Sequence, residues 1–528
     1  MVHTFKTSLI CAAVLGAALA AAPLFAGAST MDVIYEQSGF NPHAGDPVVL
    51  SEASLVRVES GLLRGSFHEG VFQYLGVPYA KVPERFAAPA GADAWEGVRD
   101  ALVYGPQCPQ YLFGTTEPLT SVKTAEDCLN LNIWTPSLGE KAKKPVMVWL
   151  HGGGFSSGSA NEAHYDGENL SRIGDVVVVS VNHRLNALGH FDLSAYSEKY
   201  KNSANAGGLD LVAALKWISR NIERFGGDPD NVTIFGESGG GAKVLEMMSA
   251  PSAKGLFKRG IVESGATDTM GVRFTKPEIS REIAAETLKN LNLSGKDVEK
   301  LQSLPLGAIW EASDRALKTI AERRKIPSAM GLGYGLAWEP VSGTAFLPTD
   351  PVLDKGFAKD GEGVSLMIGS NLTEWTTIIQ AAVHKDMTAK QKALFAKAYP
   401  NEDPALAPYV DTIIRLPMLK IMSHKADQGV GSVYAYVFTK EIGDNGAYHT
   451  SEIPFVFSNT KEPSELSRTM SLLWASYART GVPQAPGAPV WEPYTRQTGA
   501  TMILDDKIYL TKDHDKALMK SLRPDYKY

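Results

Sequence analysis

The sequence predicts an α/β protein with a mostly parallel central sheet, flanked by helices and interrupted by helical insertions. Short runs rich in β-branched residues alternate with helical patterns along the 528-residue chain. Continuous apolar runs of this kind are typical of strands buried on both faces of a parallel sheet. The alternation with helices favours right-handed crossover connections. Because no low-complexity linker, repeat or charge block follows residue 30, we expect residues 29–528 to form a single domain.

The expected elements follow from local patterns. Helix 209–224 places Leu211, Ala214, Leu215 and Ile218 on one face, and Gly226-Gly227 ends it. Residues 276–324 show a longer helical pattern that we expect to cover the sheet, and a late helix is expected at 466–477. The expected strands cover residues 146–150, 176–181, 232–235, 260–262, 364–368 and 433–438.

The N-terminus is typical of a signal peptide covering residues 1–28. Lys6 precedes the apolar run 9–22, and Ala26-Gly27-Ala28 offers a small-x-small cleavage pattern with Ser29 as the first mature residue. The alternative is a membrane anchor, but the run is shorter than the roughly 20 residues of a spanning helix. We therefore expect export to the periplasm or the medium, without a stable membrane anchor. The short leader and low cysteine content fit a bacterial protein.

Charge and cysteine content narrow the function classes. The net charge of -6 gives no basic footprint for nucleic acid. Cys11 would leave with the leader, so Cys108 and Cys128 would form one disulfide in an oxidising compartment, unless they are two separate buried thiols. Cys-x-x-Cys spacing is absent, so neither a redox motif nor a zinc site is indicated. We expect no metal and no cofactor, and the oligomeric state is not predicted.

The strongest local indication of chemistry is Gly236-Glu237-Ser238-Gly239-Gly240. It lies between the strand 232–235 and the helical run 242–248, where a serine on a tight turn needs small neighbours. The positive end of the helix dipole would favour a developing oxyanion there. This arrangement predicts that Ser238 is a nucleophile.

A glycine loop supplies the second part of the predicted site. His151-Gly152-Gly153-Gly154-Phe155 follows directly on the strand 146–150. Consecutive glycines let backbone N–H groups turn toward a ligand. We expect the N–H groups of Gly153, Gly154 and Gly239 to form an oxyanion hole. The alternative is a merely flexible loop.

A serine nucleophile needs a base and an orienting acid. Glu374 follows the strand 364–368, and His449 follows the strand 433–438, which gives the α/β-hydrolase order of serine, acid and histidine. Spacing alone does not select these two among 11 histidines and many carboxylates.

A resemblance to a known family selects the acid and the histidine. From about Val56 to the C-terminal region the sequence resembles the type-B carboxylesterases, the family of cholinesterases and certain fungal lipases. The resemblance implies the α/β-hydrolase fold, with Glu374 as the acid in 369–375 and His449 as the base in 449–457. It rests on the glycine loop and on Gly76-Val77-Pro78-Tyr79-Ala80, Glu126-Asp127-Cys128-Leu129-Asn130-Leu131-Asn132, Asn182-His183-Arg184-Leu185 and Phe225-Gly226-Gly227-Asp228-Pro229.

The resemblance also implies structural pairs. It joins Cys108 to Cys128 and places Arg85 beside Glu126 as an ion pair; the alternative for the latter is two solvated charges. Glu237 would lie behind the nucleophile, either tuning the site or as a tolerated polar residue.

Two departures from the family pattern stand out. Gly239 occupies a position that is usually alanine, and the 108–128 loop contains Tyr111 and Phe113 but no tryptophan. In cholinesterases a tryptophan of that loop binds choline through cation–π attraction. A preference for choline esters is therefore not expected.

Three functions are compatible with these features. The favoured one is a serine carboxylesterase that cleaves small to medium carboxylic esters through an acyl-enzyme, with a small-molecule ester as its only predicted partner. An interfacial lipase is the second, with Leu112, Phe113 and Leu119 lining a lid. A non-catalytic cholinesterase-like binding protein is the third, although such proteins lack the nucleophile that Ser238 provides here.

Overall fold

The structure is a computed structural model that describes residues 49–112, 117–267, 273–327, 335–350, 357, 359 and 361–527, without the side chains of 49–52. The expected signal peptide and Phe113 lie outside the described residues.

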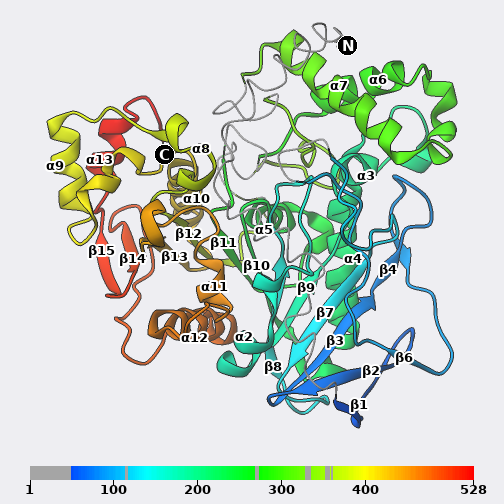
Figure 1. Ribbon diagram of the computed structural model, residues 1–528, viewed down its shortest axis with the longest axis horizontal. Helices are drawn as coiled ribbons and strands as arrows, with labels where there is room; N and C mark the ends of the chain where they lie inside the picture. The colour runs from blue at the N-terminus through cyan, green and yellow to red at the C-terminus, as the bar shows by residue number, and fades with distance from the viewer. Residues whose placement is uncertain are drawn as a thin grey trace, which may run out of the picture.

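One large sheet organises the chain (Figure 1). Every neighbouring pair from β9 to β14 is parallel, whereas the strands at both ends pair antiparallel. The predicted mostly parallel sheet is confirmed. The strand order is β1 (Val49–Val58), β2 (Gly61–His68), β3 (Val71–Pro78), β7 (Asn130–Thr135), β9 (Val177–Val181), β8 (Lys144–Leu150), β10 (Gly227–Glu237), β11 (Arg259–Glu263), β12 (Ser365–Asn371), β13 (Val433–Phe438), β14 (Ala500–Leu504) and β15 (Tyr509–Lys512).

Three short strands complete the β structure. β6 (Val98–Asp100) pairs with β2, and β4 (Ala80–Lys81) pairs with β5 (Ala90–Gly91). The central strands are buried along nearly their whole length, as their apolar sequences predict. The sequence analysis did not anticipate the antiparallel ends, because strands with one exposed face lack the continuous apolar run that marks a central strand.

Helices cover the sheet close to the expected positions. α4 (Ala206–Asn221) begins three residues before the predicted start, and Gly226 ends its 3-10 extension with a left-handed φ of 78°. α5 (Gly239–Ser249) follows β10, and α12 (Glu465–Thr480) matches the predicted late helix. The short helices α2 (Glu168–Gly174), α3 (Asn186–His190) and α11 (Ile453–Val456) lie in the connections.

The predicted helical excursion consists of α6 (Pro277–Asn290) and α7 (Leu306–Arg324), joined through a 3-10 segment, Gly295–Gln302. These helices share a hydrophobic cluster with Phe86, Leu188 and Phe191 that is separate from the main core. A second helical group contains α8 (Thr376–Val383), α9 (Ala389–Ala398), α10 (Arg415–Asp427) and α13 (Lys516–Leu522). Figure 1 shows α6 and α7 on one side of the molecule and α9 and α13 on the other.

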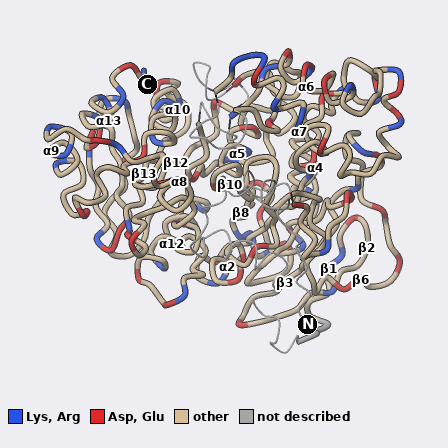
Figure 2. Tube along the Cα trace, turned by 45° about the horizontal axis from the view of Figure 1, so that its top comes forward, with Lys and Arg blue, Asp and Glu red and all other residues tan. Residues whose placement is uncertain are grey.

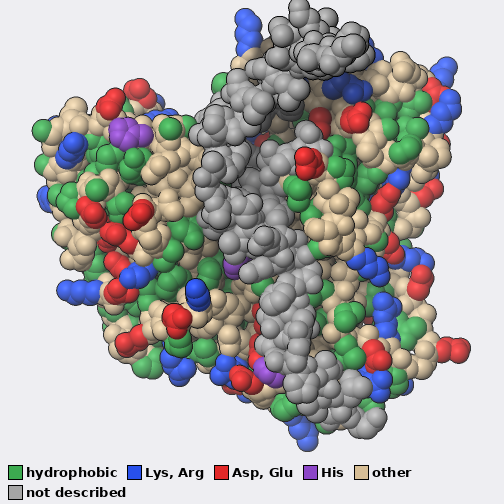
Figure 3. Space-filling model, in the orientation of Figure 1, with side chains coloured by type: hydrophobic (Ala, Val, Ile, Leu, Met, Phe, Trp, Pro, Cys, Tyr) green, Lys and Arg blue, Asp and Glu red, His purple; other side chains and the backbone are tan. Residues whose placement is uncertain are grey.

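The surface carries mixed charge. Positive and negative residues alternate along the outer loops in Figure 2, and on the face seen in Figure 3 they are interspersed with hydrophobic side chains. Within the described residues, none of the helices has the length and apolarity required to cross a bilayer.

Candidate active site

Ser238 occupies a strained turn between β10 and α5. Its φ of 54° and ψ of -122° lie outside the regions that a serine ordinarily adopts, and such strain is characteristic of a nucleophile held on a strand-to-helix turn. Glycine neighbours permit the turn, since a Cβ on Gly240 would come within 1.9 Å of the Leu150 carbonyl oxygen. The Ser238 N–H donates to the Glu263 carbonyl at 2.8 Å, which anchors the turn to β11.

The structure brings Ser238, His449 and Glu374 into one hydrogen-bonded relay. His449 Nε2 lies 2.9 Å from Ser238 Oγ, and its Nδ1 lies 2.7 Å from Glu374 Oε2. The other oxygen of Glu374 accepts from the Ser264 hydroxyl and the Asn371 N–H, each at 2.7 Å. These residues follow β10, β12 and β13, whose carboxyl ends meet at one edge of the parallel sheet.

Two further contacts fix the histidine. Its backbone N–H donates to the Glu374 carbonyl at 2.6 Å. The Trp375 ring stacks on the His449 ring with centroids 4.5 Å apart and planes inclined by 26°. The imidazole is therefore held at one edge by a carboxylate and on one face by an indole.

Burial controls the protonation of the relay. It lowers the pKa of His449 to about 4, against the opposing charges of Glu452 and Asp411. It raises the pKa of Glu374, with a further increase from Asp411. The lowered pKa of His449 favours the neutral imidazole, which is the form that can accept a proton from Ser238.

Three other glutamates surround the relay. Glu237, Glu263 and Glu452 are each at most 1% exposed. Glu237 Oε1 lies 3.3 Å from His449 Nε2, and burial raises the Glu237 pKa well above its ordinary value, with further increases from the neighbouring carboxyl groups. Burial therefore favours the protonated form of this carboxyl group, which lies beside His449 and next to Ser238, where the sequence analysis had left its role open.

The glycine loop lies against Ser238. Gly153 and Gly154 have positive φ values of 79° and 60°. A Cβ on Gly152 would lie 3.6 Å from Ser238 Cβ, and one on Gly239 would lie 2.5 Å from Gly154 Cα. The three predicted oxyanion-hole residues are thus brought together beside Ser238.

The close approach also leaves no space for a side chain at Gly239. Its Cβ would lie only 2.2 Å from the Gly154 carbonyl oxygen. Because that atom belongs to the backbone, an alanine side chain has no space in this arrangement of the loop.

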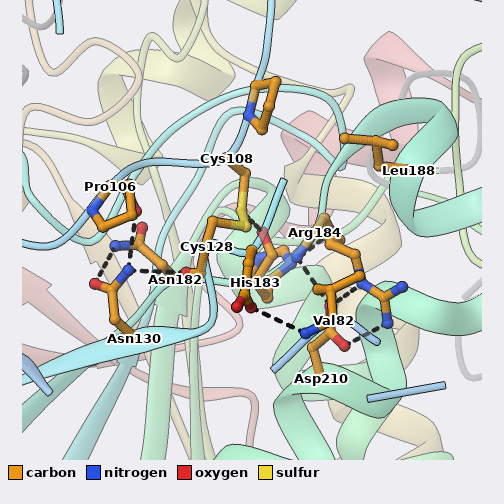
Figure 4. Close-up of a disulfide and its surroundings, with 12 residues drawn as sticks. Val82, Pro106, Cys108, Cys128, Asn130, Asn182, His183, Arg184, Leu188 and Asp210 are labelled. Carbon is orange, nitrogen blue, oxygen red and sulfur yellow. Dashed lines mark hydrogen bonds and ion pairs between the residues drawn. A yellow bond between two sulfur atoms is a disulfide. The ribbon is translucent and has the colours of Figure 1, made fainter. Parts of the chain in front are cut away.

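A disulfide joins Cys108 to Cys128 beside the site (Figure 4). Within its loop, the Gln110 side chain exchanges hydrogen bonds with the N–H and carbonyl of Gly158, at 2.7 and 2.9 Å. The disulfide loop is therefore fixed to the segment that continues from the glycine loop.

Arg85 and Glu126 form the expected ion pair. The Arg85 guanidinium donates to both carboxylate oxygens of Glu126, at 2.6 and 2.5 Å. It also donates to the carbonyls of Leu301 and Leu304, at 2.9 and 2.5 Å. The pair thus connects the disulfide loop to the helical insertion.

Sequence reasoning missed several neighbours of the site. Trp375 was part of a recognised segment but received no role, and nothing indicated that Ser264 would contact the acid. Lys243 was not singled out, although a lysine in the apolar run 242–248 is an anomaly that could have been noticed. A charged residue in a buried helix generally requires specific partners.

The fold and the serine–histidine–glutamate relay define an α/β-hydrolase. The carboxylesterase family profile matches residues 52–405 and 401–520. The chain belongs to the carboxylesterase family and is a carboxylic ester hydrolase. The recognised family and the predicted α/β-hydrolase fold are confirmed.

Relatives of known activity cover nearly the whole chain. The para-nitrobenzyl esterase of Bacillus subtilis is 34% identical over 503 residues, covering 89% of this chain and 98% of that protein. The human cocaine esterase is 31% identical, covering 81% and 82%. A solved esterase from Clostridium hathewayi that hydrolyses aliphatic aromatic polyesters has a TM-score of 0.79 at 36% identity, covering 90% and 98%.

Proposed function

We propose that Ser238, His449 and Glu374 form the catalytic triad of this esterase. The observation that carries the proposal is the continuous relay from Ser238 Oγ through His449 to Glu374, with distances of 2.9 and 2.7 Å. Ser238 Oγ attacks the ester carbonyl carbon while its proton moves to His449 Nε2. The carbonyl electron pair moves onto oxygen, which the N–H groups of Gly153, Gly154 and Gly239 stabilise.

Collapse of this intermediate breaks the bond to the alcohol, which leaves with the proton from His449. A water activated by His449 then hydrolyses the acyl-enzyme by the same route and releases the acid. Glu374 orients the imidazole and stabilises its cationic form.

Replacement of the nucleophile tests the assignment. Ser238→Ala should fold normally, lose labelling by a fluorophosphonate probe, and retain less than about 1% of the wild-type kcat. A purified variant above that level, or one still labelled at the active site, would contradict the triad. An unlabelled wild-type protein would instead favour the binding-protein alternative.

The preferred substrates are small to medium carboxylic esters. The relatives named above, which include a para-nitrobenzyl esterase, support this size class. Hydrolysis of esters of increasing acyl length, together with emulsified triglyceride and an aliphatic aromatic polyester, tests it. A jump in rate at the emulsion interface would point to the lipase alternative.

We also propose a single catalytic domain after residue 28 and export of the mature chain. One sheet running from β1 to β15 supports the single domain. The N-terminus of protein recovered from the oxidising compartment should be Ser29. Retention of residues 1–28 on the purified protein would contradict cleavage.

A further inference from the structure

Lys243 is a buried lysine immediately behind the glycine loop. It lies on α5, five residues after Ser238, and its exposed fraction is 0%. Its Nζ donates to the carbonyl oxygens of His151 at 2.9 Å and Gly154 at 2.7 Å. The same nitrogen lies 5.2 Å from the centroid of the Phe155 ring. The ammonium group is therefore directed at the backbone of one loop.

The two peptide groups held by this lysine flank the two that carry the Gly153 and Gly154 N–H groups. The inner carbonyls are also occupied. The Gly152 oxygen lies 3.0 Å from His151 Nδ1, and the Gly153 oxygen accepts from the Ser157 N–H and hydroxyl, each at 3.1 Å. In a trans peptide the N–H points opposite to the carbonyl. Because the carbonyls of residues 151–154 are all held by hydrogen bonds, the directions of the Gly153 and Gly154 N–H groups are fixed.

These N–H groups remain available to a ligand. Among the described residues, the N–H groups of Gly153 and Gly154 donate no hydrogen bond. Both glycines are only partly buried, so these N–H groups can face an oxygen atom of a ligand.

In its protonated form Lys243 also brings a positive charge to this region. Burial lowers its pKa to about 7, and Glu246 and Glu237 oppose this lowering. Burial likewise lowers the pKa values of His151, His183 and His190, which keeps these three rings neutral. A charge behind the hole would strengthen its attraction for an oxyanion.

We propose that Lys243 is a positioning residue of the oxyanion hole: it holds the carbonyls of His151 and Gly154 so that the N–H groups of Gly153 and Gly154 face the substrate oxygen. This inference rests on the oxyanion hole and triad proposed above. The hole is needed most when Ser238 Oγ bonds to the carbonyl carbon and the C=O electron pair becomes a full charge on oxygen. Loss of the clamp should therefore reduce transition-state binding more than substrate binding.

The chain offers a matched control in Lys425. This lysine is also 0% exposed, donates to the carbonyls of Val430 and Glu362, and lies 6.0 Å from the Phe357 ring centroid. It lies on α10 and contacts none of the proposed site residues. Lys243→Met and Lys425→Met therefore remove the same kind of clamp at two different places.

The expected result is a separation of the two variants. Lys243→Met should lower kcat about tenfold to a hundredfold, somewhat less than the loss of an oxyanion donor, and leave KM within about threefold. Its affinity for a trifluoromethyl ketone, which forms a tetrahedral oxyanion with Ser238, should fall by a similar factor. Lys425→Met should keep kcat within about twofold of wild type, even if its Tm falls by as much as the Tm of Lys243→Met. Lys243→Gln, whose uncharged NH₂ group can still donate to a backbone carbonyl, should recover part of the lost kcat.

Several outcomes would overturn the inference. One is a folded Lys243→Met protein with kcat and ketone affinity unchanged. Another is an equal loss of kcat in Lys425→Met at the same Tm. If Ser238→Ala is inactive while Lys243→Met is fully active, only this inference fails. Turnover by Ser238→Ala would instead remove the proposed site itself.

Discussion

Two groups of buried charges follow strands of the same sheet and differ in how they are compensated. After β9, the Arg184 guanidinium donates to both Asp210 oxygens at 2.8 and 2.7 Å, and the two side chains are 1% and 0% exposed (Figure 4). Further hydrogen bonds complete this pair. The Arg184 backbone N–H also donates to Asp210, and the guanidinium donates to the Ala87 carbonyl. Its charges are balanced and its geometry is bidentate.

The group at the carboxyl ends of β10, β11, β12 and β13 is not balanced in this way. Glu237, Glu263, Glu374 and Glu452 are buried together, and burial raises the pKa of each of them. Neither carboxyl oxygen of Glu237 has a hydrogen-bond partner among the described residues. Burial also raises the pKa of Asp210, so the two groups differ in the presence of a paired cation and not in the direction of the shift. A compensated buried pair is typical of structural support, whereas carboxyl groups clustered without such a partner are typical of a reaction site.

The largest expected effect is on catalysis by Glu374. Glu374→Gln preserves the shape of the side chain but offers the imidazole an amide that can donate to Nδ1, which favours the wrong tautomer. By comparison with other triads, kcat should fall about 10⁴-fold with folding intact. Steady-state kinetics measures the loss of kcat, and the melting temperature shows whether the variant is still folded. A kcat within about tenfold of wild type would remove Glu374 from the triad.

The next effect is on stability, at the compensated pair. Asp210→Asn leaves the Arg184 guanidinium buried beside a neutral amide, so the free energy of unfolding should fall by about 3–5 kcal/mol. Urea denaturation measures it. The matched control is Asp427→Asn, whose bidentate partner Arg496 is 37% exposed while Asp427 itself is 49% exposed. Asp427→Asn should lower the free energy of unfolding by at most about 1 kcal/mol. Equal losses in the two variants would contradict the claim that the buried pair contributes more to stability than the exposed pair.

The pH dependence of kcat/KM probes the unbalanced group. His449 acts as a base only when neutral, so activity appears as pH rises through its pKa. Because burial lowers that pKa to about 4 from 6.5, the acid limb should have its midpoint below pH 6.5. A midpoint at or above 6.5 would show that the surrounding carboxylates outweigh burial.

The smallest effect is expected at Glu237. Burial raises its pKa, which favours the protonated form, and glutamine is a near-isostere of that form. Glu237→Gln should therefore change kcat/KM by less than about tenfold and leave the free energy of unfolding nearly unchanged. A loss of kcat/KM above about a hundredfold would mean that the reaction requires the ionised form of Glu237 and that its surroundings stabilise this charge despite burial.

The sequence alone determined the features that depend on local pattern. The central strands are continuous apolar runs, and the strand-to-helix turn at Ser238 requires glycine neighbours. Both features can therefore be predicted from a stretch of a few residues. The acid and the base were selected only through the family resemblance, because spacing does not distinguish one histidine from another. The antiparallel ends of the sheet and the helices α9, α10 and α13 were not predicted.

Tertiary structure alone decided the contacts between distant segments. Lys243 is adjacent in sequence to neither His151 nor Gly154, yet the crossover from β8 through β9 to β10 brings α5 against the glycine loop. The same holds for Glu452 beside Asn371 and for Trp375 on the His449 ring. Burial and pKa follow from such packing, because the cost of a charge depends on every element that excludes water from it. A local pattern shows which residue can react, whereas the folded chain sets its protonation and its partners.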